Sequence, residues 1–232
     1  MPSYILAHDI GTSGNKAALF DEHGALVSST TVPYATYIAD SVCIEQSAED
    51  WWKAVSLATK QVLQGIAPSD VVAIGVSGQM IACLPVDRLG NPLHNAIIWS
   101  DTRAVQEAEA LRAAFGEPTL YHITGQPVSP NYVLPKIMWF KAHYPQLYKE
   151  TFCFLQSKDF VNARLTGGVI KTDPTDAAYT LAYDIGRGCW SEQILSFAEI
   201  SKDKFPEVVP CGTIIGKVCK KAADACGLPA GI

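Results

Sequence analysis

Three short β-forming segments open the chain, separated by tight turns, and this order restricts the fold more than any other feature. The segments cover residues 4–8, 16–20 and 25–32, and the turns between them are rich in Gly, Asp, Ser and Asn. Runs of this length joined by turn-forming residues predict an antiparallel meander. Helix-type and strand-type segments alternate after the meander, so we predict an α/β fold.

The region after the meander predicts helices and further strands. Ser47 is placed to cap a helix, with Asp50 in capping-box position and apolar residues following at helical spacing. The continuous apolar run 71–76 predicts a buried strand. Two more strands are expected over residues 82–86 and 96–99, and further helices over 102–115, 135–144, 158–165 and 191–197. Because no linker, low-complexity segment or clear repeat interrupts this pattern, we treat residues 1–232 as one domain.

Composition excludes several classes of protein. Hydrophobic residues make up 48% of the 232 residues and charged residues 18%, which argues against disorder as the main state. The 18 Lys and Arg against 23 Asp and Glu give a net charge of −5, so we expect no nucleic-acid partner. The apolar runs are too short to span a bilayer, and the first residues lack the pattern of a signal peptide, so no membrane partner is expected.

The cysteines favour a reducing compartment. They are odd in number, and none forms a Cys-x-x-Cys pair or has a His at metal-ligand spacing. Scattered cysteines of this kind are usually free thiols that pack as small hydrophobic residues. We therefore expect a cytoplasmic protein with seven free thiols, at Cys43, Cys83, Cys153, Cys189, Cys211, Cys219 and Cys226.

The turn after the first predicted strand has the residues of a phosphate site. It contains Asp9, Gly11, Thr12, Ser13 and Lys16 in the pattern Asp-x-Gly-Thr-Ser-Gly-x-Lys. The carboxylate can hold Mg²⁺ through water, the turn offers N–H groups and hydroxyls to phosphate oxygens, and the lysine adds a cation. The spacing is that of neither a P-loop nor a dinucleotide fingerprint, because a strand follows instead of a helix. The alternative is an ordinary hairpin, since the same residues favour turns.

Two later segments end predicted strands with polar or aromatic residues. Ser77-Gly78-Gln79-Met80 lacks the second glycine of a serine-hydrolase elbow, and its amide and flexible apolar side chain suit a small polyol. Trp99, Asp101 and Arg103 form the second group, with an indole face for C–H groups and two charged groups for hydroxyls. A plain loop in the first case, and a helix cap with a solvated arginine in the second, are the alternatives.

Several motifs in order resemble one family of enzymes. After the phosphate-type turn come Glu-Gln-x-x-Glu-Asp-Trp-Trp at 45–52, Ser-Gly-Gln-Met at 77–80 and Ala-Ile-Ile-Trp-Ser-Asp-Thr-Arg at 96–103. Further matches are Ile-Thr-Gly at 123–125, Pro-Lys-Ile-Met-Trp at 135–139, Lys-Asp-Phe at 158–160, Arg-Leu-Thr-Gly at 164–167, Thr-Asp-x-x-Asp-Ala at 172–177 and Gly-Leu-Pro-Ala-Gly at 227–231. Through nearly its whole length the chain resembles the N-terminal, sugar-binding domain of the FGGY-family carbohydrate kinases, and the xylulokinase branch is closest.

The resemblance implies a fold and a missing half. The fold would be a ribonuclease-H-like domain of the actin, sugar-kinase and Hsp70 type, with a five-stranded mixed sheet flanked by helices. ATP and sugar would lie between this domain and its own C-terminal domain, which is absent from this chain. The chain looks cut rather than finished, because the general-base Asp of the family is expected just beyond Ile232. The isolated chain is therefore expected to be inactive.

The resemblance also implies roles for the candidate residues. Asp9 would be the catalytic residue of this domain and would hold Mg²⁺ through water, while Gly11, Thr12, Ser13 and Lys16 would bind the phosphates of ATP. The sugar would be bound by Gln79, Met80, Ile81, Trp99, Asp101 and Arg103. Ile81 stands where the xylulokinase branch often has His, which leaves the identity of the sugar open.

We therefore expect a carbohydrate kinase, an ATP-dependent phosphotransferase acting on an alcohol group. The expected reaction is transfer of phosphate to a ketose, with D-xylulose converted to xylulose 5-phosphate in xylose metabolism. The alternatives are a kinase for glycerol, gluconate or ribulose, and a non-catalytic sugar-binding or regulatory domain. Partners would be the small-molecule sugar and the chain's own C-terminal domain. A homodimer is compatible with the sequence, which does not fix the oligomeric state.

Overall fold

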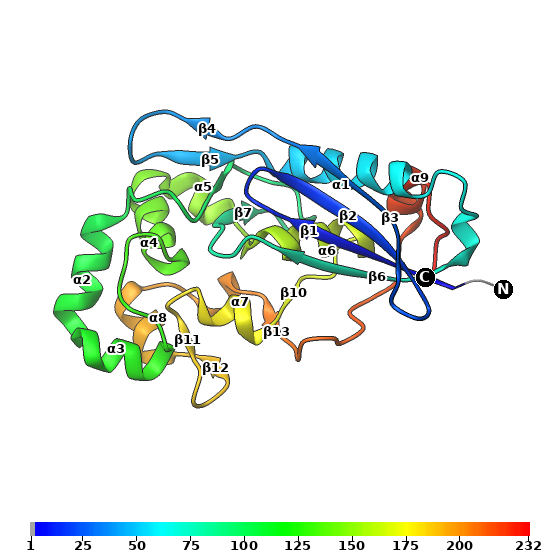
Figure 1. The fold of residues 1–232 in the computed structure, drawn as a ribbon. Helices are drawn as coiled ribbons and strands as arrows, with labels where there is room; N and C mark the ends of the chain where they lie inside the picture. Colours follow the sequence, from blue (N-terminus) through cyan, green and yellow to red (C-terminus); the bar gives the residue numbers. More distant parts are fainter. Residues whose placement is uncertain (1–2) are drawn as a thin grey trace.

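A mixed sheet forms one side of the protein in the computed structural model, which describes residues 3–232. Its strand order is β3 (Leu26–Pro33), β2 (Gly14–Asp21), β1 (Tyr4–Ile10) and β6 (Val71–Gly78). The first three are antiparallel neighbours and form the predicted meander, whereas β6 runs parallel to β1 (Figure 1). The α/β fold predicted from the sequence is thus confirmed.

The sheet has four strands among the described residues, not the expected five. The strands expected over 82–86 and 96–99 are present as β7 (Leu84–Val86) and β8 (Ala96–Ile97), but they leave the main sheet. β7 pairs with β9 (Cys153–Leu155), and β8 pairs with β5 (Ile44–Gln46). The remaining short strands are β4 (Tyr37–Ile38) beside β5, β10 (Lys171–Thr172) with β13 (Glu207–Val208), and β11 (Tyr183–Asp184) with β12 (Cys189–Trp190).

The helices cover one face of the sheet and build an extension at one end of it (Figure 1). Within residues 3–232 they are α1 (Ala48–Val62), α2 (Val105–Phe115), α3 (Glu117–Thr124), α4 (Val133–His143), α5 (Pro145–Glu150), α6 (Ser157–Thr166), α7 (Pro174–Ala178), α8 (Glu192–Ala198) and α9 (Lys220–Cys226), with 3₁₀ turns at Pro68–Asp70 and Lys202–Lys204. Each helix expected from the sequence is present, and α3, α5 and α7 were not expected. The described part of the chain contains no helix long and apolar enough to cross a membrane.

The start of α1 differs from the expected capping box. The helix begins at Ala48, directly after Ser47 as predicted, but the Ser47 side chain makes no capping hydrogen bond. The backbone carbonyl of Ser47 instead accepts the N–H groups of Asp50 and Trp51, at 3.1 and 3.4 Å. Packing holds the helix, because Trp51, Val55, Ala58 and Val62 are buried against the sheet.

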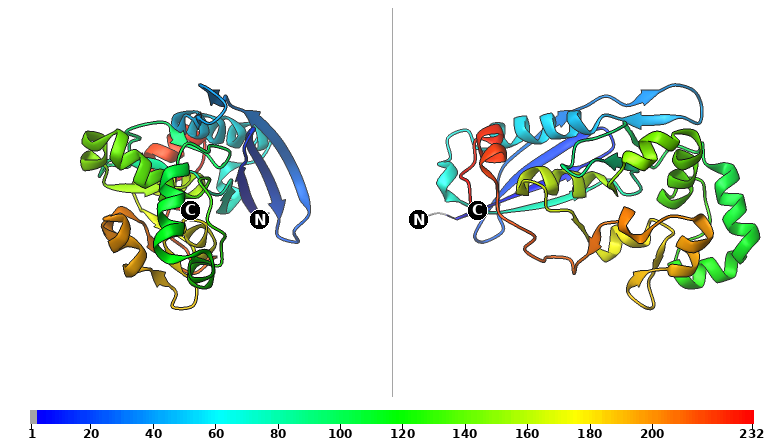
Figure 2. Two further views of the ribbon diagram at one scale, coloured as in Figure 1. Left: turned by 90° about the vertical axis from the view of Figure 1, so that its left-hand side faces the viewer. Right: turned by 180° about the vertical axis from the view of Figure 1, so that it is seen from behind.

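One face of the sheet is covered and the other is bare. Leu6 and Leu19 point to the covered face and are fully buried with residues of α1, whereas Ile5 on the opposite face is exposed. Seen along the sheet, the helices lie on one side of it only (Figure 2). The strand at 71–76 was expected to be buried, and this is wrong for most of its length. Val71 is buried, but Val72 is 54% exposed, because β6 lies at the edge of a sheet with one bare face.

Candidate active site

The predicted phosphate turn is a tight hairpin between β1 and β2. The N–H of Gly11 donates to the carbonyl oxygen of Gly14 at 3.0 Å, and the hydroxyl of Tyr34 donates to the carbonyl of Gly11. Thr12 and Ser13 at the tip are exposed to solvent. The turn is therefore fixed at its base, and its two hydroxyl groups face outward where a phosphate could reach them.

Asp9 and Lys16 lie opposite one another beside this turn. They are register partners of β1 and β2, and Asp9 is also the register partner of Ser77 on β6. All three residues are exposed on the bare face of the sheet. The carboxylate of Asp9 lies close to the hydroxyl of Tyr34, since burial together with this charge raises the pKa of Tyr34.

The donor set at this end of the sheet fits a magnesium ion that also contacts phosphate. Mg²⁺ in phosphoryl-transfer sites typically takes one or two carboxylates, with water and phosphate oxygens as its other ligands. Asp9 supplies one exposed carboxylate, and Lys16 places a positive charge across from it. Within residues 3–232 no three His, Cys, Asp or Glu side chains converge on a metal position. Asp9 is thus suited to hold a cation through water rather than within a protein cage.

A buried glutamine joins the phosphate turn to the first predicted sugar segment. Gln46 is fully buried, and its amide nitrogen donates to the carbonyl oxygen of Thr12 at 2.7 Å. Its amide oxygen accepts the side-chain N–H of Gln79 at 2.7 Å and the indole N–H of Trp51 at 3.0 Å. Gln46 was missed in the sequence analysis, because its spacing carries no sign of a central role. The contact fixes Gln79 next to the turn.

Trp99 joins the second sugar segment to the same turn. Its indole N–H donates to the hydroxyl of Thr12 at 3.0 Å, and its carbonyl oxygen accepts the side-chain amide of Asn131 at 2.8 Å. The Trp99 side chain remains 44% exposed, and Met80 is 41% exposed. Ile81 is only 9% exposed and packs into the core of the helical extension. Trp99 and Met80 therefore offer surface to a ligand, whereas Ile81 lies beneath them.

The expectation that Asp101 and Arg103 contact the sugar directly is corrected by their geometry. Asp101 is fully buried, and its two carboxylate oxygens accept the N–H of Ile44 at 2.6 Å and the backbone and guanidinium N–H groups of Arg103. The Arg103 side chain is also buried, pairs with Glu45 at 2.9 Å and lies over the ring of Trp139 at 4.8 Å. These two charged groups satisfy each other behind the pocket wall, so no free carboxylate or guanidinium faces a ligand there.

The candidate residues form an open surface and not an enclosed pocket. A cavity of about 620 Å³ lies elsewhere, along the free edge of β6, with lining residues from 72–76, α6 and 209–218. None of the predicted phosphate or sugar residues lines it. We give the arrangement of Thr12, Gln79 and Trp99 more weight than this cavity, because polar groups converge at the former.

Comparison with known proteins agrees with this arrangement. Residues 4–232 match the family described as "FGGY family of carbohydrate kinases, N-terminal domain". The chain belongs to this family. A xylulose kinase of Staphylococcus xylosus is 33% identical over 230 residues, which are 99% of this chain and 47% of that relative. A glycerol kinase of Brucella ovis is also 33% identical, over 224 residues, which are 93% of this chain and 45% of that relative.

A solved structure gives the same result for the fold. The xylulose kinase from Rhodospirillum rubrum superposes with a TM-score of 0.92 at 25% identity, over 98% of this chain and 47% of that one. The ribonuclease-H-like fold of the sugar kinases is therefore confirmed for this FGGY domain. The chain spans about half the length of the relatives it matches.

Proposed function

We propose that this FGGY domain is the sugar-binding part of an ATP-dependent kinase that phosphorylates a ketose, D-xylulose first of all. The observation that carries the proposal is the 3.0 Å hydrogen bond from the indole of Trp99 to the hydroxyl of Thr12. It links the wall of the proposed sugar pocket to the proposed phosphate turn. A sugar lying against Trp99 would have a hydroxyl near a phosphate bound at the turn, as direct transfer requires.

The residues of this chain would act mainly by position and charge. Asp9 and Lys16 would orient the phosphates together with Gly11 and the two hydroxyls of the turn at Thr12 and Ser13. Mg²⁺, when bound near Asp9, neutralises charge on the transferring phosphoryl group. Trp99, Met80 and Gln79 would hold the sugar, and Asp101 with Arg103 would support them from behind. The base that removes the proton from the sugar hydroxyl is proposed to lie beyond residue 232, in a C-terminal domain.

A second candidate substrate has independent support. The glycerol kinase relative is as similar to this chain as the xylulose kinase relative is, at 33% identity each. Gluconate and ribulose also stay within the proposed class of substrate, as does a role in sugar binding without catalysis. We place the proposed activity in xylose use in the cytosol, in keeping with the seven thiols of the sequence, and we leave a homodimer as part of the proposal.

The test is a comparison of sugars with the complete protein, including any chain beyond Ile232. kcat/KM is measured for D-xylulose, L-xylulose, D-ribulose, glycerol and gluconate by coupled ATP consumption. D-xylulose is expected to give the highest value, and a strong preference for glycerol or gluconate would contradict the ketose assignment. Absence of turnover with every sugar, together with retained sugar binding, would favour the non-catalytic domain.

A variant at Asp9 tests the proposed chemistry in the same assay. Asp9→Asn is expected to lower kcat by roughly 10²–10⁴ with sugar KM nearly unchanged, because it removes charge stabilisation that matters mainly in the transition state. If Asp9 serves only the hairpin, Asn replaces it without loss, since both residues suit turns. A near-normal kcat in the variant would therefore support the plain hairpin.

A further inference from the structure

The segment after β6 contains a backbone conformation that its sequence disfavours. Ile81 has a φ of 67°, in the left-handed region. A β-branched residue is rarely found there, because its side chain crowds the backbone. Such a conformation persists only where the surrounding structure holds it, and it is found most often at functional sites. The contacts of Ile81 should therefore show what holds it.

Two buried polar side chains hold the peptide groups on either side of Ile81. The N–H of Ile81 donates to the amide oxygen of Gln156 at 2.6 Å. The carbonyl oxygen of Ile81 accepts the amine of Lys136 at 3.3 Å. Gln156 precedes α6 beneath the sheet and Lys136 belongs to α4 of the extension, so the two groups come from different parts of the fold (Figure 1).

Lys136 also reaches the second proposed sugar segment. Its amine donates to the carbonyl oxygen of Ile98 at 2.6 Å, one residue before Trp99. The side chain is fully buried, and burial lowers the pKa of Lys136 to about 7. A buried amine bonded to two backbone carbonyls, with no carboxylate hydrogen-bonded to it, is an expensive way to stabilise a core. Its position between the segments that carry Met80 and Trp99 suggests another use.

We propose that Lys136 and Gln156 are positioning residues that set the shape of the sugar pocket. Lys136 ties the segment 79–81 to the segment 98–99, and Gln156 holds Ile81 in its left-handed conformation so that Met80 faces the ligand. Gln156 is itself fixed, because its amide nitrogen donates to the carbonyl oxygen of Asp176 at 2.7 Å. This inference rests on the proposed sugar site, and neither residue need touch the sugar.

The first test uses two lysines of the same helix in the complete protein. Lys136→Met keeps most of the side-chain length and removes the donor. Lys141→Met is the matched control, because Lys141 also lies on α4 and donates to a backbone carbonyl, that of Glu199 at 2.8 Å, in the extension. We expect Lys136→Met to raise the KM for sugar about tenfold or more while the KM for ATP stays within about twofold. Equal sugar KM values in the two variants, or a parallel rise in both KM values, would overturn the proposal.

Hydrogen–deuterium exchange keeps the test independent of turnover. Peptides covering residues 79–83 and 97–103 should both exchange at least about tenfold faster in Lys136→Met than in Lys141→Met, since the amine joins them. If the unmodified protein phosphorylates no sugar, the proposed function fails while this measurement still decides the role of Lys136. Faster exchange spread evenly over the molecule would show a general loss of structure and would overturn the proposal.

A double-variant cycle tests Gln156 and does not depend on Lys136→Met being folded. Glycine adopts a positive φ without side-chain crowding, so a chain with Ile81→Gly should need Gln156 less. Gln156→Leu is therefore expected to raise the sugar KM about tenfold in the normal background and less than about threefold in the Ile81→Gly background. The same factor in both backgrounds would show that Gln156 does not act through Ile81 and would overturn that part of the proposal.

Discussion

His8 lies on the covered face of β1, where its imidazole is held in a neutral network. One ring nitrogen is 3.3 Å from the side-chain oxygen of Asn15, and the other is 3.2 Å from the hydroxyl of Thr59 on α1. All three side chains are buried. Burial lowers the pKa of His8 to about 4, although the hydrogen bond with Asn15 acts in the opposite direction. The network thus joins β1, β2 and α1 only while the imidazole is uncharged.

This network predicts a loss of stability in mild acid. The unfolded chain takes up a proton at His8 near pH 6.5, whereas the folded chain resists until about pH 4. The free energy of unfolding should therefore fall as the pH drops from about 6.5 to 4, by about 1.4 kcal/mol per pH unit from this group. The measurement is urea unfolding across this range for the normal chain and for His8→Gln, which cannot titrate. Equal pH slopes for the two proteins would contradict the prediction.

Single residues of the site could be located from the sequence when they follow a strand, but their contacts could not. Met80 and Trp99 are exposed at the expected place, because strand ends set their position. Asp101 was expected to face a sugar, yet its carboxylate accepts the N–H of Ile44, far away in the sequence. Gln46 and Lys136 were missed for the same reason, since their partners belong to other segments. Pairings over such distances leave no local pattern.

At the scale of elements, the meander depends on a close approach of β3 to the start of β2. A Cβ atom added at Gly14 would lie 2.7 Å from the carbonyl oxygen of Val32, which is backbone and cannot rotate away. The register pairs Gly14 with Pro33 and Asn15 with Val32. The glycine in the phosphate-type turn is thus needed by the sheet as well as by the turn, so its presence alone does not indicate phosphate binding.

Replacement of Gly14 should therefore disturb the sheet. Gly14→Ala is expected to lower the free energy of unfolding by about 1–3 kcal/mol, because the β2–β3 pair must shift to admit the methyl group. Gly75→Ala is the control in the same sheet, since nothing lies within 4 Å of a Cβ atom there. The control should leave stability unchanged or raise it by up to about 1 kcal/mol. Urea midpoints measure both, and equal losses would show that the contact at Gly14 is not responsible.

Element types were predictable, but their pairing was less so. The three strands of the meander have the expected order, because tight turns leave neighbouring runs no other partner. β7 and β8 looked like strands of the main sheet but pair with β9 and β5 instead. Hydrophobic pattern indicates that a segment is a strand and not which edge it will meet. The cluster of Asp159, Asp173 and Asp176 around Lys158 also forms only through folding.

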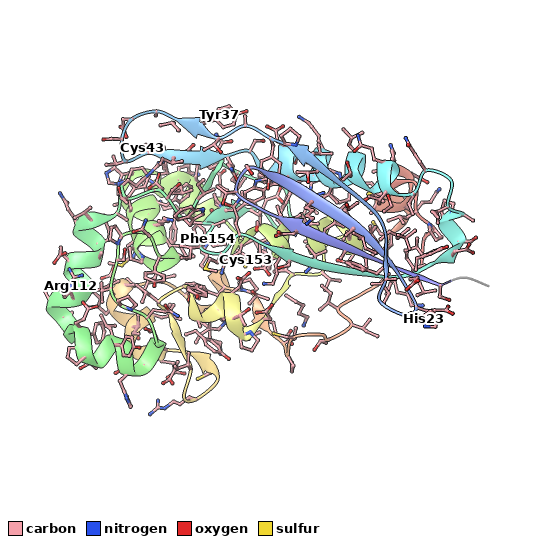
Figure 3. All side chains as sticks on the ribbon, viewed as in Figure 1. His23, Tyr37, Cys43, Arg112, Cys153 and Phe154 are labelled. Carbon is pink, nitrogen blue, oxygen red and sulfur yellow. The ribbon has the colours of Figure 1, made fainter. Side chains whose placement is uncertain are left out.

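At the scale of the whole molecule, β9 separates the core of the helical extension from the core under the sheet. Cys153 packs with the residues beneath the sheet, whereas Phe154 packs with the extension. Both lie near the centre of the molecule, far from the peripheral His23 and Arg112 (Figure 3). The alternation of a strand thus sends successive side chains into two cores and ties the parts together. This supports reading the described residues as one domain.

The proposed division of the active site leads to a prediction for the 232-residue chain alone. Because the general base is proposed to lie beyond Ile232, this chain should show less than about 1% of the sugar-dependent ATP turnover of the complete protein, as loss of a general base typically costs 10²-fold or more. A coupled assay at equal concentrations measures both. The control is circular dichroism of the shorter chain, which must show folded protein. Higher turnover from a folded sample would place the base within residues 1–232.

The open edge of β6 matters for how such a protein can be handled in a cell. Among residues 3–232, β6 bonds with β1 alone, so its other edge displays backbone groups, and the sheet face beside it carries exposed apolar side chains such as Ile5 and Val72. An uncovered edge of this kind is a template on which a second copy can add a strand. Whenever these residues are present without a cover, during synthesis for example, collisions between copies compete with correct folding. Crowding of nascent chains, more than heat, is then the condition against which this half of the fold needs protection.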